Sequence, residues 1–127
     1  MKNKCLFSAP FSFVTEIQKE YSDVVETVFN EIWFNNDLAF DPDICYWVVN
    51  PGQYFEIDST ILAFFPNLRV IITPSTGTNH ININDCNNRS VKVYSLLDDR
   101  EGLQKITASA EFTFMLILNT LKRLDIG

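Results

Sequence analysis

Residues 45–49 of the chain read Cys-Tyr-Trp-Val-Val, an unbroken apolar run that ends at Asn50-Pro51-Gly52, and this stretch decides the fold class. A strand with one face in water alternates apolar and polar residues, whereas a strand covered on both faces is apolar throughout. The turn-forming residues stop the run after five positions, which is too short for a buried helix. The run therefore predicts a central strand of a parallel sheet.

Strand and helix signals alternate along the chain on both sides of this run. Further strands are predicted at residues 4–7, 24–29, 68–73 and 91–94, and helices within residues 12–21, 58–66 and 84–88. Asp58 is placed to cap the second helix and Pro66 to end it. Because each crossover must return to the same sheet, the alternation predicts an α/β, flavodoxin-like open parallel sheet with helices on both faces. Residues 30–43 have no clear period and carry no predicted element.

Composition narrows the range of partners and cellular locations. Sixteen acidic against ten basic residues give a formal charge of −6, which repels a nucleic-acid backbone. The three cysteines, Cys5, Cys45 and Cys86, lie in or near apolar runs and are expected to be reduced core residues, which favours a cytoplasmic location. Their scattered positions, with one histidine in the chain, predict no metal site. No export signal is expected in the first ten residues.

The four glycines exclude one class of cofactor site within the chain. A dinucleotide fingerprint needs three glycines within six residues, whereas Gly52, Gly77, Gly102 and Gly127 are at least twenty-five positions apart. A phosphate-binding loop of the GxxxxGK type is absent for the same reason.

The last predicted helix, within residues 106–124, is apolar around most of its circumference. Residues 112–118 are apolar at six of seven positions, with Thr113 as the exception. The apolar stretch is much shorter than the about 20 residues that cross a bilayer, so we expect no membrane partner. A helix of this kind is normally buried on most sides. Its covering would come from the preceding domain, a second subunit or further sequence.

The loop at residues 73–79 is the most informative of those that follow predicted strands. Its Ser-Thr-Gly-Thr-Asn sequence can aim successive backbone N–H groups at one point, which holds a carboxylate or phosphate without a cationic side chain. Gly77 would let a ligand approach the backbone closely or would adopt a positive φ. A plain turn is the alternative interpretation.

At this loop the sequence resembles the D-isomer-specific 2-hydroxyacid dehydrogenases. Residues 67–81, NLRVIITPSTGTNHI, are similar to the substrate loop of that family, and VKVYS at residues 91–95 to a strand that follows it. TASAEFT at residues 107–113 resembles the start of a family helix, although Phe112 stands where a histidine is usual. Arg89-Ser90 also departs from the family, which commonly has a glycine there. The similarity covers about half of the chain.

The resemblance implies the N-terminal substrate-binding portion of an NAD-dependent enzyme that transfers hydride between NAD(H) and a 2-hydroxy or 2-oxo acid. Residues 1–104 would form the flavodoxin-like substrate domain, and residues 105–127 the interdomain helix that joins a Rossmann domain. Thr76 and Gly77, with Thr78, would donate backbone N–H groups to the substrate carboxylate. The family's catalytic and cofactor-binding residues would lie beyond residue 127, so the chain alone is expected to be inactive and to bind no NAD. Family members commonly dimerise through this helical region, which implies a homodimer.

The sequence also bears on other functions. A non-catalytic module that dimerises through the helix at 106–124 is the alternative function. A phosphoacceptor receiver domain is excluded, because it needs acidic residues where the chain has Ser8-Ala9 and Val49-Asn50. His80, the single histidine, is expected to be a hydrogen-bonded packing residue rather than a catalytic one. Residues 98–101 are expected to form a solvated, charged turn.

Overall fold

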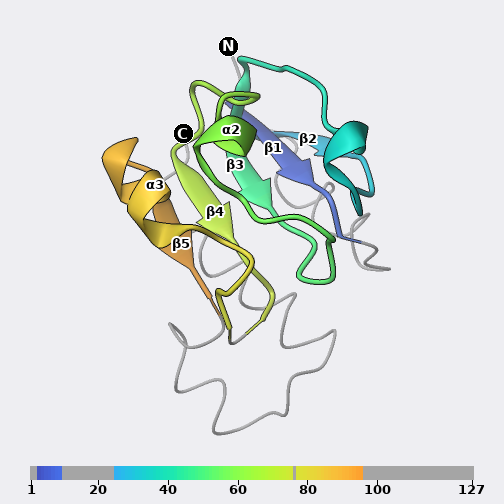
Figure 1. The fold of residues 1–127 in the computed structure, drawn as a ribbon. Helices are drawn as coiled ribbons and strands as arrows, with labels where there is room; N and C mark the ends of the chain where they lie inside the picture. The colour runs from blue at the N-terminus through green and yellow to red at the C-terminus, as the bar shows by residue number, and fades with distance from the viewer. Residues whose placement is uncertain (1–2, 10–24, 76, 96–127) are drawn as a thin grey trace, which may run out of the picture.

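In a computed structural model, residues 3–9, 25–75 and 77–95 are described, and they form one parallel sheet (Figure 1). The strands are β1 (Asn3–Phe7), β2 (Val25–Phe29), β3 (Ile44–Val48), β4 (Val70–Ile72) and β5 (Lys92–Tyr94). Every neighbouring pair is parallel, and the order across the sheet is β2-β1-β3-β4-β5. This is the flavodoxin-like order, in which the chain reverses direction across the sheet between β1 and β3. The predicted fold class is confirmed.

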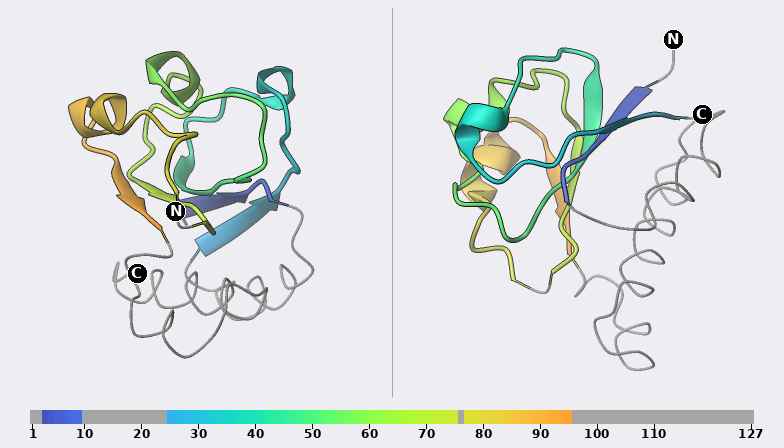
Figure 2. Two further views of the ribbon diagram at one scale, coloured as in Figure 1. Left: turned by 60° about the horizontal axis from the view of Figure 1, so that its bottom comes forward. Right: turned by 90° about the vertical axis from the view of Figure 1, so that its right-hand side faces the viewer.

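Three short helical elements cover one face of the sheet (Figure 2). They are the 3₁₀ turn η1 (Asn35–Asp37), α2 (Ser59–Leu62) and α3 (Ile83–Asn88). As predicted, the Asp58 side chain caps α2 by accepting from the Ile61 N–H at 3.1 Å. The α-helix ends at Leu62, earlier than the prediction of a stop near Pro66. The Ala63 amide still bonds four residues back, to the Ser59 carbonyl. The two amides after it bond three residues back, as in a 3₁₀ turn, with Phe64 donating to Ile61 and Phe65 to Leu62.

The strand pairing extends beyond the assigned ends of β4, in agreement with the longer strand predicted at residues 68–73. Before the strand, Arg69 N–H donates to the Cys45 carbonyl at 2.8 Å. After it, Thr73 N–H donates to the Tyr94 carbonyl at 2.8 Å. These bonds hold both ends of β4 firmly between its neighbours.

The central strands are buried on both faces, as the apolar run at 45–49 predicted. Leu6, Trp47 and Ile71 are in register and contribute to the cluster beneath the helices. Trp47 is fully buried, and its ring meets Phe65 edge-on at 5.1 Å between centroids. The alternate positions on β3, Tyr46 and Val48, are also buried and point to the opposite face. Of the three cysteines, Cys5 and Cys86 are buried core residues, whereas Cys45 is only partly buried.

Several predicted features lie outside the described residues. These are the helix within 12–21, the charged turn at 98–101, the apolar helix at 106–124, and the domain boundary between residues 104 and 105. Within the described ranges, no helix is long and apolar enough to cross a membrane.

Candidate functional site

Small polar side chains gather where the strands end. Ser8, Asn50, Thr73 and Ser95 each follow a strand within two residues, and each is at most 7 % exposed. The carboxyl ends of parallel strands share one edge of the sheet, which is where ligands bind in open α/β folds. A ligand site is therefore expected at this edge.

At the boundary between β1 and β3, the polar side chains are used by the fold itself. The Ser8 hydroxyl donates to the Val48 carbonyl at 3.2 Å and accepts from Trp47 Nε1 at 2.8 Å. The Asn50 amide donates to the Ile32 carbonyl at 3.0 Å, and its Oδ1 accepts from Gly52 N–H at 3.0 Å. Ser8 and Asn50 therefore fix the surrounding loops.

A chain of hydrogen bonds organises the loop after β4. Ser75 donates its hydroxyl proton to the Gly77 carbonyl at 2.8 Å, so its oxygen accepts from the Thr73 hydroxyl at 2.7 Å. Thr73 has then no proton left for His80, whose Nε2 lies 3.0 Å from the Thr73 oxygen. His80 must therefore donate through Nε2–H, which fixes its tautomer.

His80 is a half-buried packing residue in this chain of bonds, as predicted. Burial lowers the pKa of His80 below its ordinary value, which favours the neutral ring. The backbone of His80 is also used, because its carbonyl accepts from Ile57 N–H at 2.8 Å. Through Thr73 and Ser75, the ring helps to fix the position of the Gly77 peptide.

Of the three predicted substrate-binding residues, Gly77 and Thr78 are described and Thr76 lies outside the described residues. The carbonyls of Gly77 and Thr78 accept hydrogen bonds from Ser75 and Ile81, respectively. Their two N–H groups have no acceptor within the described part of the chain. The loop thus presents, next to the polar edge of the sheet, two successive donors that no described residue engages.

The backbone at Gly77 has open space beside it and does not adopt a conformation that requires glycine. Its φ lies outside the left-handed region, so the positive φ considered above is not adopted. A Cβ built on Gly77 would meet no heavy atom within 4 Å. The fold itself therefore does not require glycine at this position, and the space beside the Gly77 backbone is open to an approaching group.

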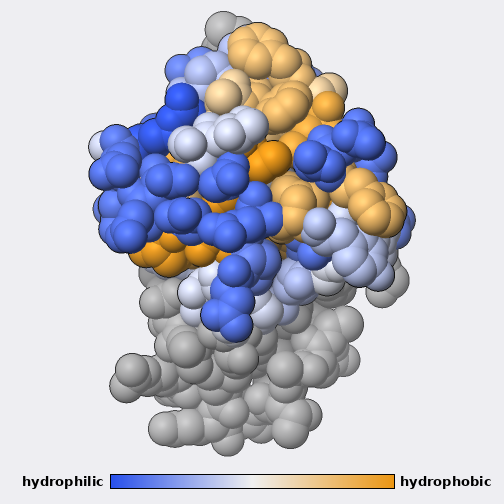
Figure 3. All heavy atoms as spheres, viewed as in Figure 1, coloured by the Kyte–Doolittle hydropathy of each residue, from blue (hydrophilic) through white to orange (hydrophobic). Residues whose placement is uncertain are grey.

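A cluster of aromatic side chains that was not predicted lies where the loop after β3 meets the segment around η1. The Phe34 and Tyr54 rings stack at 5.1 Å, and Trp33 lies 6.2 Å from Tyr54 between centroids. Tyr54 N–H donates to the Trp33 carbonyl at 2.7 Å, which ties the loop after β3 to the segment before η1. Phe34, Phe40 and Tyr54 are exposed aromatic side chains. The face shown in Figure 3 is apolar between α2 and η1 and polar over α3. The signal in the sequence was the aromatic content of residues 30–43.

The loop after β3 also holds an unsatisfied buried acceptor. Gln53 is 8 % exposed, and its Nε2 donates to the Phe55 carbonyl at 3.2 Å. Its Oε1 is buried without a hydrogen-bond partner. This carbonyl oxygen could accept from a water molecule or a ligand hydroxyl.

The described residues offer no metal-binding cluster, and two of their thiols are made unreactive by burial. No group of three or more His, Cys, Asp or Glu side chains within these ranges could hold a metal ion. Burial raises the pKa of Cys5, and burial together with the charge of Asp85 raises that of Cys86 to about 11. Both thiols therefore stay protonated and unreactive at neutral pH.

Comparison with known proteins finds likeness among solved structures. No protein-family model and no curated protein matches the sequence. Among solved structures, a glyoxylate reductase from Paecilomyes thermophila matches at TM-score 0.64 and 8% identity, over 74% of this chain and 32% of that one. A 3-phosphoglycerate dehydrogenase with bound NAD+ from Entamoeba histolytica matches at TM-score 0.59 and 19% identity, over 80% of this chain and 35% of that one.

A third solved structure carries the family name. It is a putative D-isomer specific 2-hydroxyacid dehydrogenase, NAD-binding, from Polaromonas sp. JS6 66, which matches at TM-score 0.53 and 19% identity, over 73% of this chain and 30% of that one. The chain spans about a third of the length of these proteins. The fold expected from the sequence resemblance is therefore confirmed.

Proposed function

We propose that the chain is the N-terminal, substrate-binding portion of an NAD-dependent D-2-hydroxyacid dehydrogenase. In the intact enzyme, hydride would pass between NAD(H) and a 2-hydroxy or 2-oxo acid. The observation that carries this proposal is that the N–H groups of Gly77 and Thr78, beside the carboxyl end of β4, have no acceptor among the described residues. The sequence resemblance centred on the same loop and the likeness in fold support it.

The role of the loop would be to hold the substrate carboxylate. Backbone N–H groups of Thr76, Gly77 and Thr78 would donate to its oxygens, and hydrogen bonds to a charged group contribute about 1.5–3 kcal/mol each. The space where a Cβ at Gly77 would stand lets an oxygen reach the peptide N–H closely. The Ser75 hydroxyl, by holding the Gly77 carbonyl, keeps the intervening peptide in one orientation before the substrate arrives.

The chain has no residues suited to hold the phosphates of the dinucleotide. Its own residues therefore account for substrate binding and not for hydride transfer. NAD supplies the hydride acceptor or donor when bound, and its phosphates need closely spaced glycines that this chain lacks. We propose no catalytic residue here, since His80 is engaged in fixing the loop. The chain alone is expected to bind 2-oxo acids weakly and NAD not at all.

The test is an amide chemical-shift titration of the 127-residue chain with pyruvate. The Gly77 and Thr78 signals are expected to shift together and to saturate. Gly77→Ala should weaken binding about tenfold, since the methyl group occupies the approach to the N–H groups and one such bond is lost. The free energy of unfolding should stay unchanged, because the new Cβ meets nothing within 4 Å. No shift at residues 77 and 78, or equal binding by the variant, would refute the proposed site.

A homodimer through residues 106–124 and a cytoplasmic location belong to the same proposal. Two described buried cysteines are free thiols, which supports a reducing compartment. Light scattering at low concentration is expected to show a dimer. Replacement of Phe114 and Leu118 by charged residues is expected to give a soluble monomer. A wild-type monomer would contradict the dimer.

A further inference from the structure

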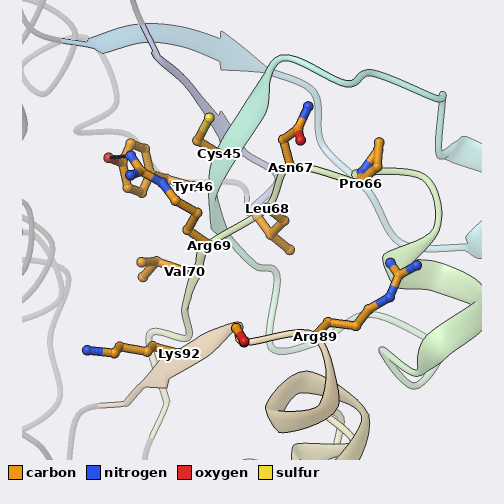
Figure 4. A pocket seen from close by; sticks show the side chains of 10 residues that line it. Cys45, Tyr46, Pro66, Asn67, Leu68, Arg69, Val70, Arg89 and Lys92 are labelled. Carbon is orange, nitrogen blue, oxygen red and sulfur yellow. Dashed lines mark hydrogen bonds between the residues drawn. The ribbon is translucent and has the colours of Figure 1, made fainter.

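The edge of the sheet opposite the proposed substrate loop contains a cavity of about 630 Å³. It lies at the amino ends of β3, β4 and β5, and Tyr46, Leu68, Arg69, Arg89, Ser90 and Lys92 are among the residues that line it (Figure 4). The carboxylate-binding loop proposed above follows the carboxyl end of β4, so the two places are separated by the length of that strand. Nothing in the proposed function uses this cavity.

The cavity concentrates positive charge in an acidic protein. Arg69, Arg89 and Lys92 line it, whereas no aspartate or glutamate appears among its described lining residues. The whole chain has only ten basic residues and a formal charge of −6. The ion pairs that occur within the described ranges both belong to Lys4, which bonds to Asp41 and Glu26. The three cations are thus not neutralised by any described carboxylate, which favours binding of an anion.

One of these cations is already held in place. The Arg69 guanidinium lies 5.2 Å from the centroid of the Tyr46 ring and donates a hydrogen bond to the Tyr46 hydroxyl. Tyr46 itself is buried in β3. Stacking and hydrogen bonding together restrict the Arg69 side chain, so little conformational entropy would be lost when an anion binds.

A tight turn after α3, beside the cavity, places one residue in a strained backbone conformation. Ser90 adopts φ 59° at the end of α3, where glycine is usual. Val91 N–H donates to the Cys86 carbonyl at 2.8 Å and Ser90 N–H to the Asn87 carbonyl at 3.1 Å, which closes the helix. This turn places Arg89 on one side of Ser90 and Lys92 on the other, both at the cavity.

We propose that this cavity binds a phosphorylated small organic molecule. Arginine pairs with phosphate oxygens through two parallel N–H donors, and a group with nearly two negative charges suits several cations better than one carboxylate does. The volume is within the range of about 300–1,000 Å³ that small-molecule sites occupy. Leu68, Val70 and the Tyr46 ring provide apolar walls for an organic part. Arg69, Arg89 and Lys92, which line the cavity, would attract the phosphate.

The experiment is a calorimetric and amide-shift titration of the full chain with glucose 6-phosphate at low ionic strength. Binding is expected, with shifts at residues 69 and 89–92. Arg69→Gln and Lys92→Gln should each weaken it about tenfold, and both positions are exposed, so folding should be retained. Lys4→Gln is the matched control, because it removes one positive charge at the same edge of the sheet but outside the cavity. The affinity of Lys4→Gln for glucose 6-phosphate is expected to differ from that of the unsubstituted chain by no more than about twofold.

Other outcomes would overturn the proposal. Absence of binding by glucose 6-phosphate would do so, as would equal losses in Lys4→Gln and in the two cavity variants. If inorganic phosphate binds as tightly as glucose 6-phosphate, the cavity does not recognise the organic part of the ligand, and that part of the proposal is overturned. Pyruvate titrated in parallel reports on the Gly77 loop separately, so failure at one edge is distinguished from failure at the other.

Discussion

His80 connects the packing of a single ring with the shape of the loop after β4. Its Nε2–H bond to Thr73 starts the chain of bonds that ends at the Gly77 carbonyl. The position of Gly77 and Thr78 after a strand could be predicted from the sequence, because strand ends and turn residues are local signals. The bonds between Thr73, Ser75 and His80 could not, since they depend on side-chain directions that only the folded loop defines.

At this scale, the stability of the fold is expected to depend on pH through His80. Its pKa is lowered by burial in the fold, so between the folded value and the ordinary value of 6.5 the unfolded chain binds more protons. The stabilising contribution is therefore present above pH 6.5 and is lost as pH falls through the folded value. Urea unfolding from about pH 8 to about pH 5.5 measures it. His80→Gln, which cannot ionise, should show a weaker pH dependence in this window; an identical dependence would contradict the assignment.

Ser90 is the one described non-glycine residue with a positive φ. A side chain in this region costs on the order of 1 kcal/mol, and Ser90 is exposed, so little packing is lost with its side chain. Ser90→Gly is expected to raise the free energy of unfolding by about 1 kcal/mol in urea denaturation. Ser59→Gly is the matched control, because it makes the same change in the first turn of α2 and should destabilise. A lower stability of Ser90→Gly would show that the turn is not strained.

At the scale of elements, the starts of α2 and α3 are tied to each other. Ile57 and Ile81 form a parallel bridge just before the two helices. Asp85, in the first turn of α3, accepts from the Ser59 N–H of α2 at 2.8 Å. A carboxylate of one helix thus satisfies a terminal donor of the other, and it is favourably placed near the positive end of α2.

Asp85→Ala is therefore expected to cost about 1 kcal/mol of stability, the usual contribution of a lost helix cap. Asn84→Ala, at the preceding exposed position of α3, is the control and should change stability much less. Thermal unfolding followed by circular dichroism measures both variants. Asp85→Asn, which keeps an oxygen acceptor, should recover part of the loss. Equal effects at positions 84 and 85 would mean that the bond to α2 contributes nothing.

The elements also show where prediction from sequence works. Asp58 caps α2 as predicted, through a bond to a residue three positions later. Asn82 caps α3 with the same spacing, but this cap was not predicted. The predicted start of the last described helix, residue 84, differs by one position from Ile83. The segment at 30–43 could not be assigned, because its aromatic rings pack against Tyr54 from a distant loop. Contacts of this kind leave no period in the sequence.

At the scale of the whole molecule, one parallel sheet presents two different edges. The carboxyl-end edge could be located from the order of strands and helices, because that order dictates which loops meet. The basic cavity at the amino-end edge was not predicted. Arg69 and Lys92 are far apart in the sequence and become neighbours only through the pairing of β4 with β5, in which Val70 faces Lys92. An acidic overall composition gave no indication of a local positive charge.

Trp47 joins the layers of the molecule into one unit. Its ring is fully buried against Phe65 beneath the helices, and its Nε1 donates to Ser8 at the end of β1. Trp47→Phe leaves a cavity and removes the donor to the Ser8 hydroxyl, so a loss of about 2 kcal/mol is expected. Trp33→Phe is the matched control, since Trp33 is only half-buried and its Nε1 donates to Glu31 on the surface; it should cost less than about 1 kcal/mol. Urea unfolding followed by circular dichroism compares the two, and equal losses would mean that the central strand is not held through Trp47.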